Sequence, residues 1–191
     1  MEGCLFTFVG PSGVGKSEVL KEIEKRFPDL LARSVSTTTR IRRSDENESD
    51  FHFKNEEEFH KMIANGEFLE YNNYVGNYYG TSFSSLIPLL EDGKNVVKVI
   101  EVNGVKSIKN SNKMQDVRHK SIFIDAPSRE VREERINMRG RLPEGEILAR
   151  LKAGDDELKF YFANKNYFNY YIINNNLDKA VRDVLKIIRK A

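Results

Sequence analysis

The chain has 191 residues, of which 39% are hydrophobic and 31% charged, a balance typical of one soluble domain rather than of a disordered chain. The 31 basic and 29 acidic residues leave a net charge of +2, too small an excess for a dedicated nucleic-acid binder. A single cysteine, Cys4, excludes an intrachain disulfide framework and a cysteine-based zinc finger. Without a leader pattern or an apolar run approaching the roughly 18 residues of a membrane span, we expect a cytoplasmic protein with no membrane partner.

The first elements of the chain are a strand, a glycine-rich turn and a helix. The apolar run over 4–9 is rich enough in aromatic and β-branched residues to predict a buried strand. A turn over 10–15 follows, and the spacing of apolar residues predicts a helix over 16–27, which Pro28 ends. This order is the beginning of a βαβ unit.

The middle of the chain is more polar. A basic segment over 34–43 and an acidic, turn-like loop over 44–50 come first. Helical spacing of apolar residues predicts helices over 55–64 and 83–90. A tyrosine-rich stretch over 71–79 alternates weakly and predicts a small hairpin.

Strands and helices alternate through the second half of the chain. Buried strands are predicted over 95–102, 121–124 and 170–173, and helices over 129–138, 144–162 and 177–188, with a basic loop over 139–143. Such alternation favours an α/β fold, a mainly parallel sheet flanked by helices.

The turn after the first strand carries a phosphate-binding motif. Residues 10–17, GPSGVGKS, match G-x-x-x-x-G-K-[ST] in full. The glycines let backbone N–H groups converge on phosphate oxygens, and the helix N-terminus adds its positive dipole end. Lys16 can bridge the β- and γ-phosphates, and the Ser17 hydroxyl can bind Mg²⁺. The phosphate-binding set is therefore predicted to be Ser12, Gly13, Val14, Gly15, Lys16 and Ser17. A plain glycine-rich turn with a solvated lysine is the alternative, but the flanking strand and helix favour a nucleoside triphosphate site.

Two clusters of arginines indicate further contacts with anions. The first comprises Arg40, Arg42 and Arg43 beside the hydroxyl side chains of 36–39; the second comprises Arg132, Arg135, Arg139 and Arg141, with Arg150 on the next helix. Guanidinium groups bind phosphate in a planar fork, and a loop of arginines could neutralise charge during phosphoryl transfer. On pattern alone the first cluster could equally be a solvated basic loop, and for the second a solvated helix balanced by Glu130, Glu133 and Glu134 is favoured.

Seven segments in order resemble the guanylate kinase family over nearly the whole chain. They are GPSGVGKS at 10–17, SVSTTTR at 34–40, GEFLEY at 66–71, GNYYGTS at 76–82, APS at 126–128, RINMRGR at 135–141 and NNNLDKA at 174–180. The resemblance implies one domain over 1–191 with a sheet of the P-loop NTPase type. It also implies a core of 1–35, 91–136 and 151–191, a small GMP-binding insertion over 36–90 and a lid over 137–150.

The resemblance also implies roles for individual residues. The positions that match GMP-binding residues are Ser36, Arg40, Arg43, Glu46, Phe51, Glu70, Tyr79, Thr81 and Glu101. The positions that match lid arginines are Arg135, Arg139 and Arg150, and these are expected to be catalytic together with Lys16 and Arg40. Asn174 matches the adenine-side asparagine of the ATP site. Glu70 is expected to recognise guanine, because a carboxylate accepts from both N1–H and the 2-amino group, whereas adenine lacks this pair of donors.

The chain departs from the family pattern at two places beside the expected GMP site. The family has L-D-I-D-x-Q-G where this chain has KVIEVNG over 98–104, so Val99 replaces the first aspartate and Glu101 the second. Phe51 replaces a tyrosine whose hydroxyl would contact the GMP phosphate. A hydrogen bond lost to a charged partner costs roughly 1.5–3 kcal/mol.

The resemblance predicts ATP-dependent phosphoryl transfer to GMP and dGMP, with Mg²⁺, in purine nucleotide metabolism, by a monomer or homodimer. Two alternatives remain open from the sequence. One is a non-catalytic module of this fold that binds phosphopeptides, with which Val99 and Phe51 are compatible. The other is a nucleoside monophosphate kinase with a different acceptor. Turnover with Mg-ATP separates the first alternative from the enzyme.

Overall fold

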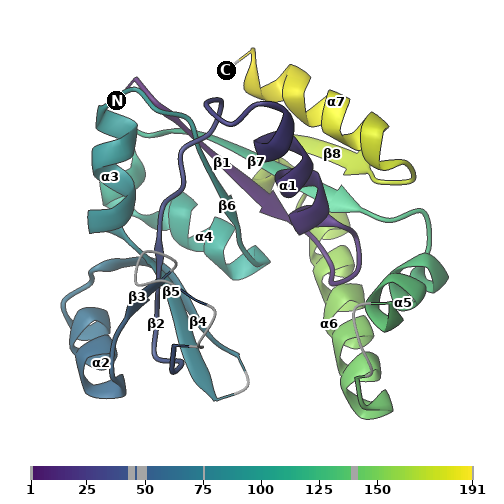
Figure 1. Ribbon diagram of the computed structural model, residues 1–191, viewed down its shortest axis with the longest axis horizontal. Coiled ribbons are helices and arrows are strands. Elements are labelled where there is room, and N and C mark those ends of the chain that lie inside the picture. The colour runs from purple at the N-terminus through teal and green to yellow at the C-terminus, as the bar shows by residue number, and fades with distance from the viewer. Residues whose placement is uncertain (1, 43–45, 47–50, 75, 139–141, 191) are drawn as a thin grey trace.

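A four-stranded parallel sheet forms the core of the computed structural model, which describes residues 2–42, 46, 51–74, 76–138 and 142–190 (Figure 1). Its strands lie in the order β6-β1-β7-β8. They span Val96–Val99 (β6), Cys4–Val9 (β1), Arg118–Asp125 (β7) and Tyr170–Ile173 (β8). The predicted α/β fold with a parallel sheet flanked by helices is confirmed.

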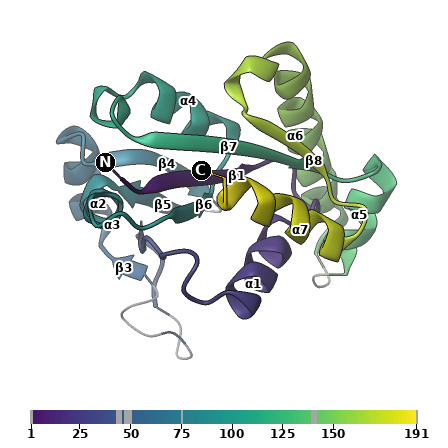
Figure 2. The same ribbon diagram turned by 90° about the horizontal axis from the view of Figure 1, so that it is seen from above.

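Helices cover both faces of this sheet (Figure 2). One face packs on α1 (Lys16–Arg26) and α7 (Leu177–Ile188), and the other on α3 (Phe83–Glu91), α4 (Val102–Asn110) and α6 (Glu144–Ala163). Successive residues of β1 therefore alternate between two apolar clusters, and every residue of this strand is buried.

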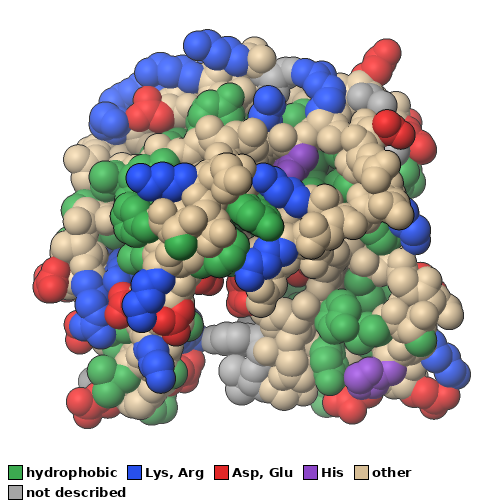
Figure 3. Space-filling view, turned by 180° about the vertical axis from the view of Figure 1, so that it is seen from behind, with side chains coloured by type: hydrophobic (Ala, Val, Ile, Leu, Met, Phe, Trp, Pro, Cys, Tyr) green, Lys and Arg blue, Asp and Glu red, His purple; other side chains and the backbone are tan. Residues whose placement is uncertain are grey.

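A second sheet, in the order β3-β2-β5-β4, forms a lobe beside the core. It comprises β2 (Ser36–Thr38), β3 (Phe51–Phe53), β4 (Phe68–Tyr74) and β5 (Asn77–Ser82), with α2 (Glu56–Ala64) beside it. Helix α5 (Arg129–Asn137) and α6 extend from the core as another lobe, and short 3₁₀ turns lie at Asn112–Met114 and Lys165–Tyr167. The space-filling view shows a hollow between the two lobes (Figure 3).

The predicted strand over 95–102 is wrong at its C-terminal end. The strand ends at Val99, and α4, which the sequence pattern did not predict, begins at Val102. An apolar run that crosses a strand end and a helix start has no period of its own, so periodicity does not separate the two. Val105 and Ile108 follow Val102 on the buried face of α4.

Other boundaries differ by smaller amounts. The hairpin predicted over 71–79 is part of a longer pair, β4 and β5, and β7 is longer than the predicted 121–124. Strands β2 and β3 have three residues each, too few to give an alternating pattern, so neither was predicted. The loop predicted over 44–50 lies outside the described residues except for Glu46, and Arg139 to Arg141 of the basic loop lie outside them too.

Half-buried His119 on β7 makes the stability of the fold depend on pH. Its Nε2 lies 2.9 Å from Thr7 Oγ1 on β1. Burial, with smaller contributions from Lys109 and Lys120, lowers the pKa of His119 to about 4 from 6.5. Between these values the unfolded chain binds a proton that the folded chain does not. Neutral His119 therefore contributes fully to the free energy of unfolding above pH 6.5. That contribution, about 3 kcal/mol, is lost as the pH falls toward 4.

We expect His119→Gln, a neutral side chain that can still reach Thr7, to remove this dependence. Urea unfolding of both proteins between pH 4 and pH 7.5 measures it. The wild type should lose stability toward pH 4 more steeply than the variant, because only the wild-type unfolded state gains a proton at position 119. Parallel curves would contradict the assignment.

Candidate functional site

The phosphate-binding motif forms the loop between β1 and α1. Gly10, Gly13 and Gly15 all have positive φ, of 132°, 83° and 89°. A Cβ on Gly10 would lie 2.0 Å from the Ile124 carbonyl oxygen, so the loop passes directly over β7. Gly15 precedes the first turn of α1, and its carbonyl accepts from Val19 N–H at 3.0 Å. The first N–H groups of a helix have no partner within the helix, so this end of α1 suits an anion.

The Lys16 side chain folds back over the loop that precedes it. Its Nζ donates to the Pro11 carbonyl oxygen at 2.9 Å and also to that of Gly10. These contacts hold the ammonium group at the mouth of the loop. A phosphate arriving there would meet a cation already positioned beside the backbone donors.

A cavity of about 500 Å³ extends from this loop into the hollow between the lobes. The sequence-predicted residues that line it are Ser12, Gly13, Gly15, Lys16, Ser17, Ser36, Phe51, Glu70, Tyr79, Thr81, Glu101 and Arg150. They come from the loop, from β2 to β5, from the segment after β6 and from α6. The fold therefore brings the predicted phosphate-binding loop and most of the predicted acceptor-binding residues to one cavity.

Glu70 on β4 is a half-buried acid that lines this cavity. Its Oε1 accepts from the Thr81 hydroxyl on β5 at 2.7 Å. Burial raises the pKa of Glu70, while the hydrogen bond from Thr81 and the charge of Lys98 oppose the shift. The carboxylate thus presents acceptor atoms in a water-poor wall of the cavity, which suits recognition of paired N–H donors.

Arg40 is not among the residues that line this cavity, but its side chain interacts with Tyr79, which does line it. Its Nη2 donates to Glu46 at 2.6 Å, and its guanidinium lies 5.5 Å from the centre of the Phe51 ring. The hydrogen bond to Glu46 is the main cause that raises the pKa of Arg40. The sequence does not reveal this pairing, because Glu46 is six residues further along the chain.

A smaller cavity, of about 300 Å³, opens on the other side of the phosphate-binding loop. Asn174 and Arg135 line it with Gly13 and Gly15, and Met138 and Leu177 add apolar surface. Asn174 Nδ2 donates to the Val14 carbonyl oxygen at 2.9 Å, and Arg135 Nη2 donates to that of Asn174 at 3.0 Å. Val14 itself packs into the core, so its role at the site is that of its backbone.

Two of the three predicted lid arginines line different cavities. Arg135 lies at the smaller cavity, whereas Arg150 on α6 lines the larger one and donates to Glu146 Oε1 at 2.7 Å. Arg139 lies outside the described residues, as does Arg43 of the predicted phosphate grip.

Three polar side chains that line the cavity were not predicted as site residues: Asn72, Lys98 and Glu157. Asn72 Nδ2 donates to Glu101 Oε1 at 2.9 Å, which links β4 to the start of α4. Burial raises the pKa of Glu157 on α6, with the nearby charge of Lys16 opposing. One of these residues could have been found from the sequence. Lys98 lies inside a run predicted as a buried strand, and a lysine is almost never fully buried without a partner.

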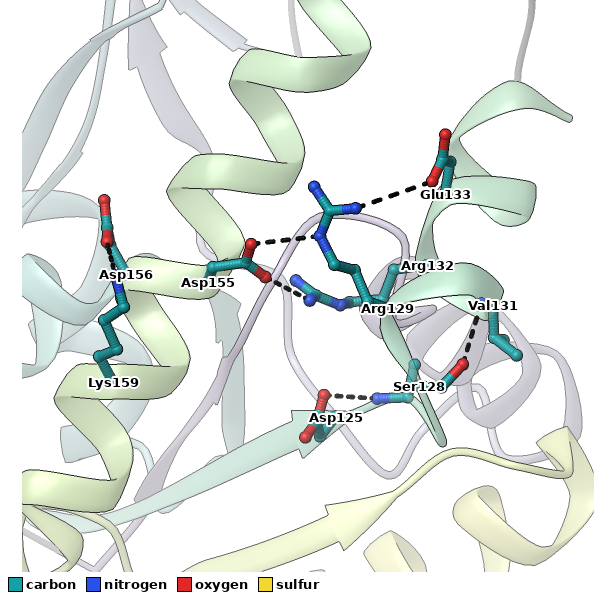
Figure 4. A network of polar contacts seen from close by, with 10 residues as sticks. Asp125, Ser128, Arg129, Val131, Arg132, Glu133, Asp155, Asp156 and Lys159 are labelled. Atoms are coloured by element: carbon teal, nitrogen blue, oxygen red, sulfur yellow. Dashed lines mark hydrogen bonds and ion pairs between the residues drawn. The ribbon is translucent and has the colours of Figure 1, made fainter.

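A polar network braces α6 against α5 beside the loop (Figure 4). Arg132 and Arg129 on α5 converge on Asp155 of α6, with Arg132 Nη2 donating to Oδ1 at 2.6 Å. Arg132 is 3% exposed, and a Cβ on Gly154 would lie 2.6 Å from its Nη1. A glycine at 154 therefore provides the space that the buried guanidinium occupies.

Among the described residues, no group of three or more His, Cys, Asp and Glu side chains could hold a metal ion. Within the same residues, no helix is both long and apolar enough to cross a membrane.

Comparison with known proteins gives one family. The sequence model of the guanylate kinase family matches residues 4–191. A guanylate kinase of Prochlorococcus marinus is 38% identical over 185 residues, which cover 97% of this chain and 96% of that one. A guanylate kinase of Thermotoga maritima is 40% identical over 99% of this chain and 87% of its own length. The crystal structure of guanylate kinase from Anaplasma phagocytophilum covers 98% of this chain and 85% of that chain, with a TM-score of 0.69 and 27% identity.

Proposed function

Because the chain belongs to the guanylate kinase family, and is thus a nucleoside monophosphate kinase, we propose that its central cavity holds GMP and the phosphates of ATP side by side. The observation that carries this assignment is the shared lining of that cavity. Lys16 of the phosphate-binding loop and Glu70 of the second sheet line one space of about 500 Å³. A donor and an acceptor bound there are close enough for direct transfer.

On the donor side, backbone N–H groups of 12–17 and the Lys16 ammonium hold the β- and γ-phosphates. Asn174, Arg135 and the apolar side chains of Met138 and Leu177 hold the adenine in the smaller cavity, which lies next to the loop. An oxygen of the GMP phosphate attacks the γ-phosphorus, and the bond to the β,γ-bridging oxygen breaks to give ADP and GDP. The cations stabilise the charge that spreads over the transferred group, and no dedicated base is required.

On the acceptor side, Glu70 and Thr81 recognise the guanine of GMP or dGMP. Ser36 and Tyr79, which line the same cavity, contact its phosphate. Arg40, which donates one N–H group to Glu46, has further N–H donors with which it also contacts that phosphate. Arg43, Arg139 and Arg150 complete the anion contacts when 36–90 and 137–150 close over the core.

The donor atoms beside the loop fit Mg²⁺. The Ser17 hydroxyl and the carboxylates of Glu101 and Glu157 line the cavity, and these hard oxygen atoms are ligands that Mg²⁺ prefers, directly or through water. Ser17 would bind the ion, while the two glutamates would hold its water shell. When bound, Mg²⁺ supplies charge neutralisation at the β- and γ-phosphates.

The acceptor is tested by an ADP-release assay with Mg-ATP against GMP, dGMP, AMP, CMP and UMP. We expect turnover with GMP and dGMP and little with the other three, because Glu70 leaves no acceptable pairing for their bases. Turnover with another monophosphate would overturn the guanine assignment while keeping the transfer reaction. Since the buried Cys4 is a free thiol, we further propose the cytoplasm, a reducing compartment, as the site of activity.

A further inference from the structure

Lys98 is a buried lysine at the acceptor side of the larger cavity. It lies on β6 of the core sheet, is 9% exposed and lines the cavity. Its Nζ donates to the Ser34 carbonyl oxygen at 3.0 Å and to Ser36 Oγ, on β2 of the second sheet, at 2.8 Å. An ammonium group has three N–H donors, and Lys98 makes these two hydrogen bonds within the part of the chain that the structure describes. One donor therefore remains for a ligand in the cavity.

Ser36 places this ammonium group beside the wall that carries Glu70. Thr37 pairs with Gly80 between the antiparallel strands β2 and β5, and one step along this register Ser36 lies opposite Thr81. Thr81 pairs in turn with Glu70 on β4, to which its hydroxyl donates at 2.7 Å. Side chains directly opposite each other on antiparallel strands lie on one face of the sheet, about 5 Å apart. Ser36, Thr81 and Glu70 therefore form one row across the second sheet, and all three line the cavity.

The packing of α4 brings Glu70 to the same side of β6 as Lys98. A Cβ on Gly104 would lie 3.0 Å from the Ile100 side chain and 3.4 Å from Glu70 Cγ, so both side chains meet at this glycine. Ile100 continues the line of β6, because its N–H donates to the Phe8 carbonyl oxygen on β1 at 3.1 Å. Lys98 precedes Ile100 by two residues and so points to the same side. Lys98 and Glu70 thus reach the cavity from adjoining walls.

This row complements the hydrogen-bonding edge of guanine. That edge carries O6, N1–H and the 2-amino group side by side, one acceptor followed by two donors. The Glu70 carboxylate accepts from the two donors, as proposed above. The Thr81 hydroxyl already donates to Glu70, so its hydrogen is not available to O6. The Lys98 ammonium, which adjoins the other end of the row, supplies the missing donor.

We propose that Lys98 is a further specificity-determining residue, whose remaining N–H group donates to O6 of the guanine base. The inference rests on the proposed binding of GMP in this cavity and on the proposed role of Glu70. It adds a contact for the third position of the base. Ser34 and Ser36 hold the ammonium group in place for that contact.

An ammonium group at this position also discriminates against adenine. Adenine carries an amino group where guanine carries O6, and an ammonium group can only donate. Two donors would then face each other inside the cavity, each without the hydrogen bond to water that it has lost. Burial lowers the pKa of Lys98 to about 8, so the group is charged at pH 7.

The test compares GMP with 6-thio-GMP, in which sulfur replaces O6 while N1–H and the 2-amino group remain. Sulfur is a weak acceptor, so the wild type should bind 6-thio-GMP roughly 10- to 100-fold more weakly than GMP. Lys98→Met keeps the length of the side chain and removes the donor. This variant should bind GMP roughly 10- to 100-fold more weakly than the wild type, and the two nucleotides within about threefold of each other. Isothermal titration calorimetry at pH 7 without ATP measures the four dissociation constants.

The comparison separates the contact with O6 from a purely structural role of Lys98. If Lys98 only tied β6 to β2, Lys98→Met would weaken GMP and 6-thio-GMP binding equally, and the inference would be overturned. Unchanged GMP binding would overturn it as well. Lys98→Leu, with the leucine that the family pattern has at this position, should give the same result as Lys98→Met. Lys94→Met removes an exposed lysine before β6 and should match the wild type with both nucleotides.

IMP tests the role of Glu70 separately. It keeps O6 and N1–H but lacks the 2-amino group, so the preference for GMP over IMP reports on the carboxylate. We expect Lys98→Met to keep part of this preference and Glu70→Gln to lose most of it. An unchanged preference in Glu70→Gln would overturn the proposed recognition of the base by Glu70. The absence of GMP binding by the wild type would overturn the proposed function itself.

Discussion

Replacing Lys16 with methionine is expected to lower kcat/KM for phosphoryl transfer from ATP to GMP by about 10³-fold, because a cation next to the transferred group stabilises the transition state more than the ground state. The Lys16 ammonium lies at the mouth of the loop, held by the carbonyl oxygens of Gly10 and Pro11. Methionine fills the same space without charge. GMP binding, measured by calorimetry without ATP, should stay within about threefold of the wild type, because the expected contacts of GMP lie on the second sheet.

A matched control is Lys21→Met on the same helix. Lys21 pairs with Glu18 at 3.3 Å and its side chain is 70% exposed, so its loss should leave kcat/KM unchanged. An ADP-release assay with saturating Mg-ATP measures both variants. A loss below about tenfold for Lys16→Met would contradict a role in stabilising the transferred phosphoryl group.

The phosphate-binding loop could be predicted from the sequence because its determinants are local. A buried strand, three glycines with positive φ and a helix start follow one another without interruption between Cys4 and Lys16. Each of these features depends on the residue type itself or on close sequence neighbours. The cavity beyond the loop needed the resemblance to a family, because Ser36, Glu70 and Glu101 meet only through the packing of β2, β4 and α4.

The contacts that the sequence did not predict depend on the pairing of side chains across elements. The ion pair of Arg40 with Glu46, at 2.6 Å, was not predicted. Lys98 could be noticed as a charge within an apolar run, yet its partners lie 62 and 64 residues away. The start of α4 was hidden for another reason, because Val102 continues the apolar run that β6 ends.

Replacing Gly13 with alanine is expected to lower the free energy of unfolding by about 2–5 kcal/mol, because backbone strain and a steric clash both act against the folded state. We also expect it to weaken ATP binding by about tenfold or more. Gly13 has φ of 83°, where a side chain is strained, and an added Cβ would lie 2.5 Å from the Arg132 backbone oxygen. Neither atom belongs to a flexible side chain. Either the loop or the beginning of α5 must therefore move, and the loop is the part that presents N–H groups to phosphate.

Two other glycines separate the strain from the clash. Gly66 has φ of 64° with no atom within 4 Å of an added Cβ, so Gly66→Ala should lose only about 1 kcal/mol. Gly145 lies within α6, also with open space, so Gly145→Ala should gain about 0.5–1 kcal/mol. Urea unfolding ranks the three variants, and calorimetry with ATP tests whether Gly13→Ala alone weakens nucleotide binding. Equal losses of stability for Gly66→Ala and Gly13→Ala would contradict this prediction. They would show that the loop moves away from Arg132 without a cost in free energy.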